Sequence, residues 1–301
     1  MEFRQAEHFL AVIDHGGVVR AAAALHLAQP SLSQSIRVLE RELGTPLFHR
    51  VGRGLVPTPA GKDLIKPARQ LLRDVATAHA SVAELSGLYN GHVDVGATAS
   101  ACESPLPVLI GDLRRAYPRV TVRVREYSSE SDITRAVLDG SVELGFGFLA
   151  PEVEDQDQPG VEVHPLSTDE MCVALPASVA AELPDPLPYD QLPDLPAIAV
   201  TSGSRARTTV EAALRRAARR TRLGVVTAHR QSAIPLVAAG AGMCWITRQQ
   251  AANADEPGVV ARASDPPIML TMAVLHRAGV LAPAARALLE VALSRRDMMA
   301  G

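Results

Sequence analysis

The spacing of apolar residues changes once along the 301-residue chain, and this change restricts the fold more than any other feature of the sequence. Up to about residue 88, apolar residues recur every three or four positions, which is the spacing of amphipathic helices. After Asn90-Gly91, short apolar runs alternate with helical segments. Alternating strands and helices are typical of a parallel sheet with crossover helices. The sequence therefore predicts a helical N-terminal part followed by an α/β part.

The N-terminal part contains three expected short helices. The first ends at His15-Gly16-Gly17, the second covers residues 18–25, and the third opens at Pro30 and closes at Gly44. Four apolar residues of the third helix fall within a wedge of about 60° at helical spacing and predict a buried face. They are Leu32, Ile36, Leu39 and Leu43.

The opposite face of this third helix is polar. It carries Pro30, Gln34, Arg37 and Arg41, and Ser31 and Ser33 flank it. A short helix, a turn and a helix with a polar N-terminal face match the helix-turn-helix plan for the DNA major groove. Gln34 suits adenine, and Arg37 suits guanine or a phosphate. The alternative is a solvated helix face in an arginine-rich chain.

Residues 45–58 form two short apolar runs around a Gly-Arg-Gly turn, which predicts a small β-hairpin, or wing. Arg50 and Arg53 on this wing are expected to contact the DNA backbone. The charge distribution weakly favours a polyanion partner for the N-terminal part. Residues 1–90 carry ten basic and eight acidic side chains, whereas the remainder carries twenty basic and twenty-five acidic ones.

Thr58-Pro59 predicts the start of a long helix that reaches about Leu88. Its apolar residues follow one another in steps of four and three, which predicts a coiled-coil seam between two chains. The alternative is a helix that packs on its own domain. The seam residues are Leu64, Ala68, Leu71, Val75, Ala78, Val82 and Leu85.

The α/β part divides into two similar series, joined by an acidic connector at 151–159. Two such lobes favour a ligand held between them, because open parallel sheets bind ligands at the carboxyl ends of their strands. Strands are expected at 92–98, 120–126, 142–149, 171–176, 197–200, 224–228, 243–247 and from 267, and helices near 105–117, 130–139, 205–219, 232–239 and 283–295.

Several classes of protein are disfavoured. The N-terminus lacks the apolar stretch of a secretory signal, and the longest uncharged run is too short and interrupted to span a bilayer. The three cysteines (Cys102, Cys172 and Cys244) lie far apart and fit neither a disulfide framework nor a zinc site, so a cytoplasmic protein without a metal is expected. The only lysines are Lys62 and Lys66, and familiar catalytic motifs are absent, so the sequence predicts no catalytic residues.

Residues 21–61 also resemble the signature of the LysR-type transcriptional regulators. The matching elements are Ala22-Ala23, Leu25, Gln29-Pro30, Ser33, Ile36, Leu39-Glu40, Leu43-Gly44, Leu47-Phe48, Arg50 and Thr58-Pro59-Ala60-Gly61. Two positions depart from the usual pattern, where Val18 and Ala28 replace a frequent Ser or Thr.

The resemblance implies an α+β and α/β multidomain protein. Its expected parts are a winged helix-turn-helix domain at 1–58 with the core motif near 18–37, a linker and dimerisation helix at 59–89, and a two-lobed domain at 90–301 like periplasmic binding proteins. Lobe I is expected at 90–160 and 267–301, and lobe II at 161–266. The implied partners are promoter DNA, a small-molecule effector, a second copy in a homodimer or homotetramer, and RNA polymerase as a further candidate, with no membrane and no cofactor.

The resemblance also implies an effector between the lobes, and residues at strand ends and helix starts there favour a small anion or polar metabolite. The expected DNA contacts are Gln29, Pro30, Ser31, Ser33, Gln34, Arg37, Arg50 and Arg53, and the expected effector contacts are Ser100, Ala101, Ser128, Ser129, Phe148, Thr201, Ser202 and His229. Alternatively, several of these residues are ordinary helix caps and sheet core. Cys102 near the cleft also leaves a thiol-based oxidant sensor open.

Two rival functions are considered. The chain could be a solute-binding module whose front helices only mediate oligomerisation, or an enzyme with a cleft between two α/β lobes. The polar face of the helix at Pro30 counts against the first, and the lack of lysines and nucleophile motifs in the lobes counts against the second.

Overall fold

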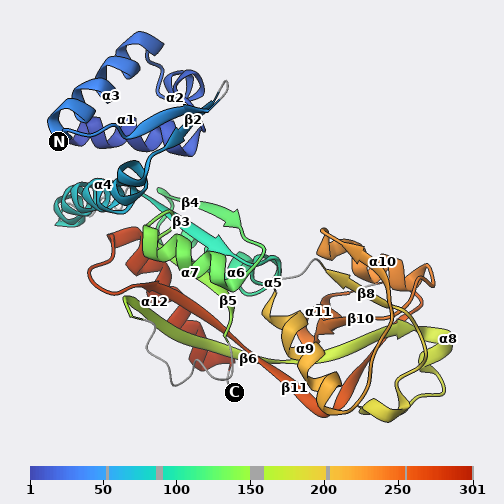
Figure 1. Ribbon diagram of the computed structural model, residues 1–301. Coiled ribbons are helices and arrows are strands. Elements are labelled where there is room, and N and C mark those ends of the chain that lie inside the picture. The colour runs from blue at the N-terminus through green and yellow to red at the C-terminus, as the bar shows by residue number, and fades with distance from the viewer. Residues whose placement is uncertain (52–53, 86–90, 150–158, 201–203, 255, 300–301) are drawn as a thin grey trace. The chain divides into compact units, whose positions relative to one another are not determined.

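Figure 1 shows the computed structural model of the chain, which describes all residues except 52–53, 86–90, 150–158, 201–203, 255 and 300–301. The described residues form two compact units. The first comprises Met1–Gly91, Asp139–Ser141 and Val280–Ala284, and the second comprises the remaining residues.

Three helices build the N-terminal core: α1 (Phe3–Asp14), α2 (Val18–Ala24) and α3 (Gln29–Leu43). Phe9, Leu32 and Leu39 are fully buried between them. The predicted order of helices is therefore confirmed. Gly44 has φ +68° and ends α3 in the left-handed conformation that glycine adopts most readily.

One residue of the expected buried face was placed wrongly. Leu43 is 42 % exposed, because it lies one turn beyond Leu39, the last α3 side chain that joins the core. The helical period alone does not reveal where the underlying core ends.

The expected wing is an antiparallel hairpin of β1 (Phe48–Val51) and β2 (Gly54–Pro57). Its entry is fixed to α3 by the carboxylate of Glu40, which accepts hydrogen bonds from the backbone N–H groups of Leu47 (2.8 Å) and Phe48 (3.3 Å). A charged acceptor makes these bonds stronger than neutral ones. Helix α3 and the wing are thereby held together.

The long helix α4 (Pro59–Leu85) begins after an N-cap residue, Thr58. The Thr58 hydroxyl accepts from the Gly61 N–H (3.0 Å) and donates to the Pro46 carbonyl (2.8 Å). Gly61 passes so close to the preceding segment that a Cβ atom would lie 2.2 Å from the Leu47 carbonyl oxygen. Only glycine fits this contact without a shift of the backbone.

The first residues of the expected α4 seam pack within the N-terminal unit. Ala68 is buried in the N-terminal core, and Leu64 and Leu71 pack against it, as the alternative interpretation proposed. Further along, Val75 is half-buried and Ala78 is exposed. The side chains of Val82 and Leu85 lie outside the described residues.

The second unit contains a seven-stranded sheet in the order β10-β6-β11-β5-β3-β4, with β7 paired to β11, and a separate pair of β8 and β9. The strands are β3 (Gly91–Ala97), β4 (Val120–Glu126), β5 (Leu144–Phe148), β6 (Val161–Pro176), β7 (Leu187–Pro188), β8 (Ala197–Val200), β9 (Leu223–Thr227), β10 (Cys244–Thr247) and β11 (Val259–Arg277).

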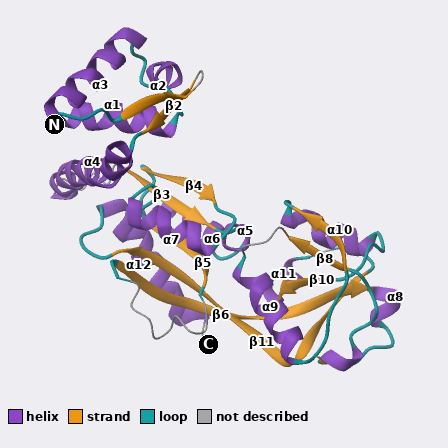
Figure 2. Ribbon diagram, viewed as in Figure 1, coloured by secondary structure: helices purple, strands orange, loops and turns teal. Residues whose placement is uncertain are grey.

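Helices accompany these strands, as Figure 2 shows. They are α5 (Ala99–Glu103), α6 (Leu106–Ala116), α7 (Glu130–Asp139), α8 (Ala177–Ala180), α9 (Arg205–Arg216), α10 (Ala233–Ala238), α11 (Arg248–Asn253) and α12 (Pro283–Met299), with short 3₁₀ helices at Tyr189–Gln191 and Arg230–Ser232.

The expectation of purely parallel sheets was wrong. The pairs β3–β5 and β8–β9 are parallel as predicted, but β6 and β11 pair antiparallel with each other, and with β10 and β5 respectively. Figure 1 shows β6 and β11 running side by side through both lobes. They are the two places where the chain crosses between the lobes.

The expected lobe boundary at residue 161 is also corrected. Val161 and Val163 pack in the hydrophobic cluster of lobe I together with Ile133 and Leu275. The corresponding cluster of lobe II contains Ala174, near the other end of β6. The chain therefore leaves lobe I within β6 and not before it.

None of the described helices combines the length and apolar character needed to cross a bilayer.

Candidate functional site

The polar face of α3 is open to solvent. Gln29, Pro30, Ser31, Gln34 and Arg37 are all exposed. Ser33 is half-buried, and its hydroxyl accepts a hydrogen bond of 3.4 Å from the Gln29 amide. The exposed polar side and the buried leucine side of α3 therefore lie as the sequence predicted.

A shallow hollow continues this surface toward the end of α3. Its lining includes Gln34, Arg37 and Arg41 together with Thr45 and Pro46 in the following loop. Arg41 and Thr45 were not among the expected DNA contacts. The helical spacing did place Arg41 on this face, but nothing in the sequence distinguishes a DNA contact at Arg41 from an ordinary solvated arginine.

The two departures from the family pattern lie at helix starts. Val18 is the first residue of α2, after the N-cap Gly17, and Ala28 is the N-cap of α3. Neither N-cap supplies a side-chain hydrogen bond. On the wing, Arg50 is exposed, whereas Arg53 lies outside the described residues.

The expected effector contacts of lobe I have different environments. The Ser100 hydroxyl accepts a 3.1 Å hydrogen bond from Nε of Arg230, and Ala101 is fully buried. Ser128 is exposed, whereas the Ser129 hydroxyl is occupied as the cap of α7, accepting from the Asp132 N–H at 3.2 Å. Ser129 therefore fits the alternative interpretation of a helix cap.

The remaining expected effector contacts also differ in their burial. Phe148 is buried and lines a cavity of about 180 Å³. His229 in lobe II is exposed, and its backbone N–H donates to the Thr227 hydroxyl. Thr201 and Ser202 lie outside the described residues.

The cavity beside Phe148 also contains two charged residues that the sequence interpretation missed. The backbone N–H of Arg205 donates a 2.9 Å hydrogen bond to Oε2 of Glu130, so the first residue of α9 meets the first residue of α7. Nε of Arg205 is buried and lacks a hydrogen-bond partner among the described residues. A buried donor without an acceptor is costly, and Arg205 is one of the residues that line the cavity.

Burial shifts the ionisation of the charged groups around this cleft. Burial raises the pKa of the Glu130 carboxyl, and hydrogen bonds from backbone amides, including those of Arg205 and Phe148, oppose this shift. Burial likewise lowers the pKa of the Arg230 guanidinium, against the attraction of Glu103 and Glu130. Charges withdrawn from water in a cleft are typical of functional sites.

Position next to a predicted helix start was the one signal that could have identified Glu130 and Arg205. Both follow a polar residue at the end of a loop, and both open a helix. Arg230 gives no such signal, because it lies in a polar loop where an arginine is ordinarily solvated.

The environment of Cys102 disfavours a reactive thiol. Burial, followed by the nearby Glu126 and Glu103 carboxylates, raises the pKa of Cys102. Thiolate character is what makes a cysteine reactive toward oxidants. The geometry therefore gives the thiol-sensor alternative no support.

A winged helix-turn-helix unit followed by a two-lobed α/β unit defines a class of DNA-binding regulator. The comparisons with known proteins agree. Residues 3–62 match the bacterial regulatory helix-turn-helix protein family of the lysR type, and residues 86–297 match the LysR substrate binding domain. The chain belongs to the LysR family of transcriptional regulators.

Relatives of known name extend over the whole chain. It is 31 % identical over 299 residues to the HTH-type transcriptional regulator TdfR of Cupriavidus pinatubonensis, covering 97 % of this chain and 98 % of the relative. It is 27 % identical over 307 residues to the nitrogen assimilation regulatory protein Nac of Klebsiella aerogenes, covering 98 % and 95 % respectively.

Solved structures share the fold. A full-length OxyR variant from Pseudomonas aeruginosa matches with a TM-score of 0.75 at 22 % identity, covering 99 % of this chain and 95 % of that chain. CbnR, a LysR family transcriptional regulator, matches with a TM-score of 0.69 at 22 % identity, covering 98 % and 99 %.

The family assignment decides between the functions considered from the sequence. The chain is a DNA-binding transcriptional regulator with an effector-binding domain, because its domains and its relatives are those of regulators. The relatives are named as regulators and not as enzymes, so the enzymatic and solute-binding alternatives are set aside.

Proposed function

We propose that α3 lies in the major groove of promoter DNA and reads bases with Ser31, Ser33, Gln34 and Arg37. The observation that carries this proposal is that Gln34 and Arg37 are exposed while Leu32 and Leu39, on the opposite side of α3, are fully buried. Amide and guanidinium groups at this spacing suit the edges of adenine and guanine.

Backbone contacts would come from residues that flank α3. Gln29 and Pro30 lie at its N-terminus, where the helix dipole favours a phosphate, and Arg50 lies on strand β1 of the wing. Arg53 stays a predicted contact. Phosphate contacts supply much of the affinity but no sequence preference.

The DNA proposal is tested with a duplex selected from a random pool by the full-length protein. Arg37→Ala is expected to lower the affinity for this duplex by about tenfold or more, since one base contact is worth about 1–3 kcal/mol. Affinity for unrelated duplexes should change much less. Arg119→Ala is the matched control, because Arg119 is exposed in the second unit.

Equal affinity of the Arg37→Ala variant and the parent for the selected duplex, in a gel-shift titration, would contradict the proposal. The oligomeric state is measured for both proteins, so that an effect on assembly is separated from an effect on the contact.

The effector is proposed to be a small organic anion that binds between Phe148 and the start of α9. The buried, unpartnered Nε of Arg205 is the donor that such an anion would meet. The Phe148 ring offers an apolar wall to the rest of the molecule. Ser100, Ala101, Ser128, Ser129, Thr201, Ser202 and His229 stay predicted contacts of this cleft.

A thermal-shift screen of the full-length protein against small carboxylates tests the effector proposal, because a ligand of the folded state raises the melting temperature. Arg205→Gln is expected to abolish the shift given by a hit, and Arg222→Gln, at an exposed position of lobe II, is expected to retain it. A hit whose shift survives in Arg205→Gln would place the effector elsewhere.

The distal half of α4 is proposed to pair with the same helix of a second copy. Val75, Ala78, Val82 and Leu85 continue the seam beyond the residues that pack on the N-terminal core. We infer a homodimer or homotetramer that acts in the cytoplasm, with RNA polymerase as a further partner.

A further inference from the structure

Two histidines and a glutamate lie on one face of the paired strands β6 and β11. Glu162 lies directly opposite His276, and His164 lies opposite Val274. Because side chains two residues apart on a strand point to the same face, Glu162 and His164 share the face of His276. The register of the two strands therefore brings three metal-ligating side chains together.

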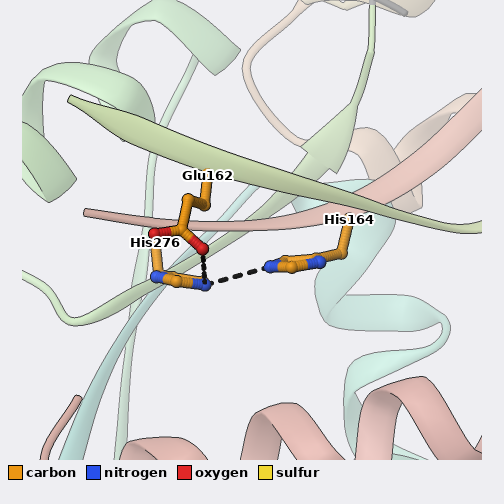
Figure 3. A group of neighbouring side chains, drawn as sticks. All are labelled: Glu162, His164 and His276. Atoms are coloured by element: carbon orange, nitrogen blue, oxygen red, sulfur yellow. Dashed lines mark hydrogen bonds and ion pairs between the residues drawn. The ribbon is translucent and has the colours of Figure 1, made fainter. Parts of the chain in front are cut away.

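The ligand atoms of this Glu-His-His cluster (Glu162, His164 and His276) converge on one point, as Figure 3 shows. The Nε2 atoms of His164 and His276 are 3.0 Å apart, and Nε2 of His276 is 3.7 Å from Oε2 of Glu162. Two nitrogens at about 2.0–2.1 Å from a tetrahedral zinc ion lie about 3.3 Å apart. These two separations lie within about 0.4 Å of the tetrahedral value, and all three ligand atoms lie within 4.8 Å of one another.

The second ring nitrogen of His276 is already engaged. Nδ1 of His276 lies 2.9 Å from the backbone carbonyl oxygen of Arg277. A carbonyl can only accept, so Nδ1 carries the proton and Nε2 presents its lone pair to the cluster. This arrangement of a ring N–H on a backbone carbonyl is the one that orients metal-ligating histidines.

The three side chains differ in how deeply they are buried. His276 is buried, His164 is half-buried and Glu162 is exposed. An ion could enter from the Glu162 side and keep water as a fourth ligand.

We propose that Glu162, His164 and His276 form a binding site for a first-row divalent transition-metal ion, with Zn²⁺ as the probe. Imidazole and carboxylate ligands suit zinc and its neighbours better than Mg²⁺ or Ca²⁺, which prefer oxygen ligands alone. A bound ion would join β6 to β11 at their lobe I end, where the chain enters and leaves the crossing between the lobes.

The site is tested on full-length protein without a polyhistidine tag, stripped with a chelator and desalted. Zn²⁺ is titrated calorimetrically, and the absorption spectrum of added Co²⁺ reports the ligand set. The expected result is one Zn²⁺ per chain, with a melting temperature that rises as Zn²⁺ is added.

Two variants and one matched control assign the binding to the cluster. Glu162→Gln, at an exposed position that does not threaten the fold, is expected to weaken Zn²⁺ binding about tenfold or more. His164→Asn is expected to abolish it. His92→Asn is the control, because His92 is exposed and lies outside the cluster, with the carboxylate of Asp94 at 3.6 Å.

Two results would overturn the proposal. One is a parent protein that binds no Zn²⁺ at a ratio of one per chain. The other is a folded Glu162→Gln variant with the parent's affinity and Co²⁺ spectrum, since this would show that the ion, if bound, lies elsewhere.

Discussion

Nε of Arg230 donates a 3.1 Å hydrogen bond to the hydroxyl of Ser100, and this bond joins residues 130 positions apart on the two lobes. Ser100 lies in α5, which follows the first strand of lobe I, and Arg230 opens the 3₁₀ helix that follows β9 in lobe II. The bond is one of the direct connections across the cleft in which we place the effector.

Ser100→Ala is expected to loosen α5. The substitution leaves Nε of the largely buried Arg230 without its acceptor, which costs about 1–3 kcal/mol. Hydrogen exchange of the amides in residues 99–103 should become several-fold faster than in the parent. Ser294→Ala is the control, since the Ser294 hydroxyl is exposed and bonds within α12. Unchanged exchange in α5 would show that the bond does not hold the lobes.

Gly61→Ala is expected to destabilise the N-terminal unit by about 2–3 kcal/mol, because the added methyl group overlaps a backbone oxygen that cannot rotate away. Thermal unfolding followed by the helical circular dichroism signal measures the change. Gly111→Ala is the control, because its Cβ would meet only the end of the Arg115 side chain at 3.6 Å. A Gly61→Ala protein as stable as the parent would contradict the close approach of α4 to Leu47.

Ala28→Ser is expected to stabilise the N-terminal unit by about 1 kcal/mol. Ala28 occupies the cap position of α3 with φ −69° and ψ 134°, and it offers no side-chain acceptor to the free N–H groups of the first turn. The melting temperature should rise. Ala23→Ser, at an exposed site inside α2, should instead lower it slightly, because serine is a poorer helix former than alanine. A decrease in both variants would contradict the expected cap.

The buried cysteines are expected to resist alkylation. Burial raises the pKa of Cys172 to about 11 and that of Cys244 to about 12, above the ordinary value of 9.0. At pH 8 the folded protein therefore holds about a hundredfold less Cys172 thiolate than the unfolded chain. Iodoacetamide labelling followed by mass spectrometry should be correspondingly slow until urea unfolds the protein. Fast labelling of Cys172 in folded protein would contradict its placement.

The same shifts fix the sign of a pH effect on stability. The folded state retains the thiol protons that the unfolded chain loses, so the stability from this source is complete below pH 9 and decreases as the pH rises toward 11 and 12. Urea unfolding at increasing pH measures this loss, and Cys172→Ala should reduce it.

The elements predicted best from the sequence were those with a continuous apolar period. The three N-terminal helices, the wing and strands such as 197–200 and 243–247 (β8 and β10) were found because each buries a regular side. The first halves of β6 and β11 were missed because their sequences, VEVHPLSTDE and VVARASDPP, mix charged residues and prolines where a buried strand would be apolar. Because β6 and β11 run antiparallel, each of these segments pairs with the more apolar second half of the other strand, which supplies what the local sequence lacks.

The candidate site was predicted less completely than the fold. The polar face of α3 follows from helical geometry alone, so its residues could be named in advance. The cleft residues Glu130, Arg205 and Arg230 depend on two lobes meeting, and no local pattern records which charged residue will be buried by a distant segment. The Glu-His-His cluster likewise depends on the register between β6 and β11.

The double crossing of β6 and β11 restricts how the effector domain can respond to a ligand. Because the two strands are paired with each other along most of their length, neither lobe can slide past the other without breaking the ladder. The ladder changes register at two points, between Ala263 and Ile268 and between Met272 and Ala273. Bending at these two irregular points leaves the remaining hydrogen bonds between β6 and β11 intact. A ligand in the cleft is therefore expected to rotate one lobe against the other, with β6 and β11 as the hinge.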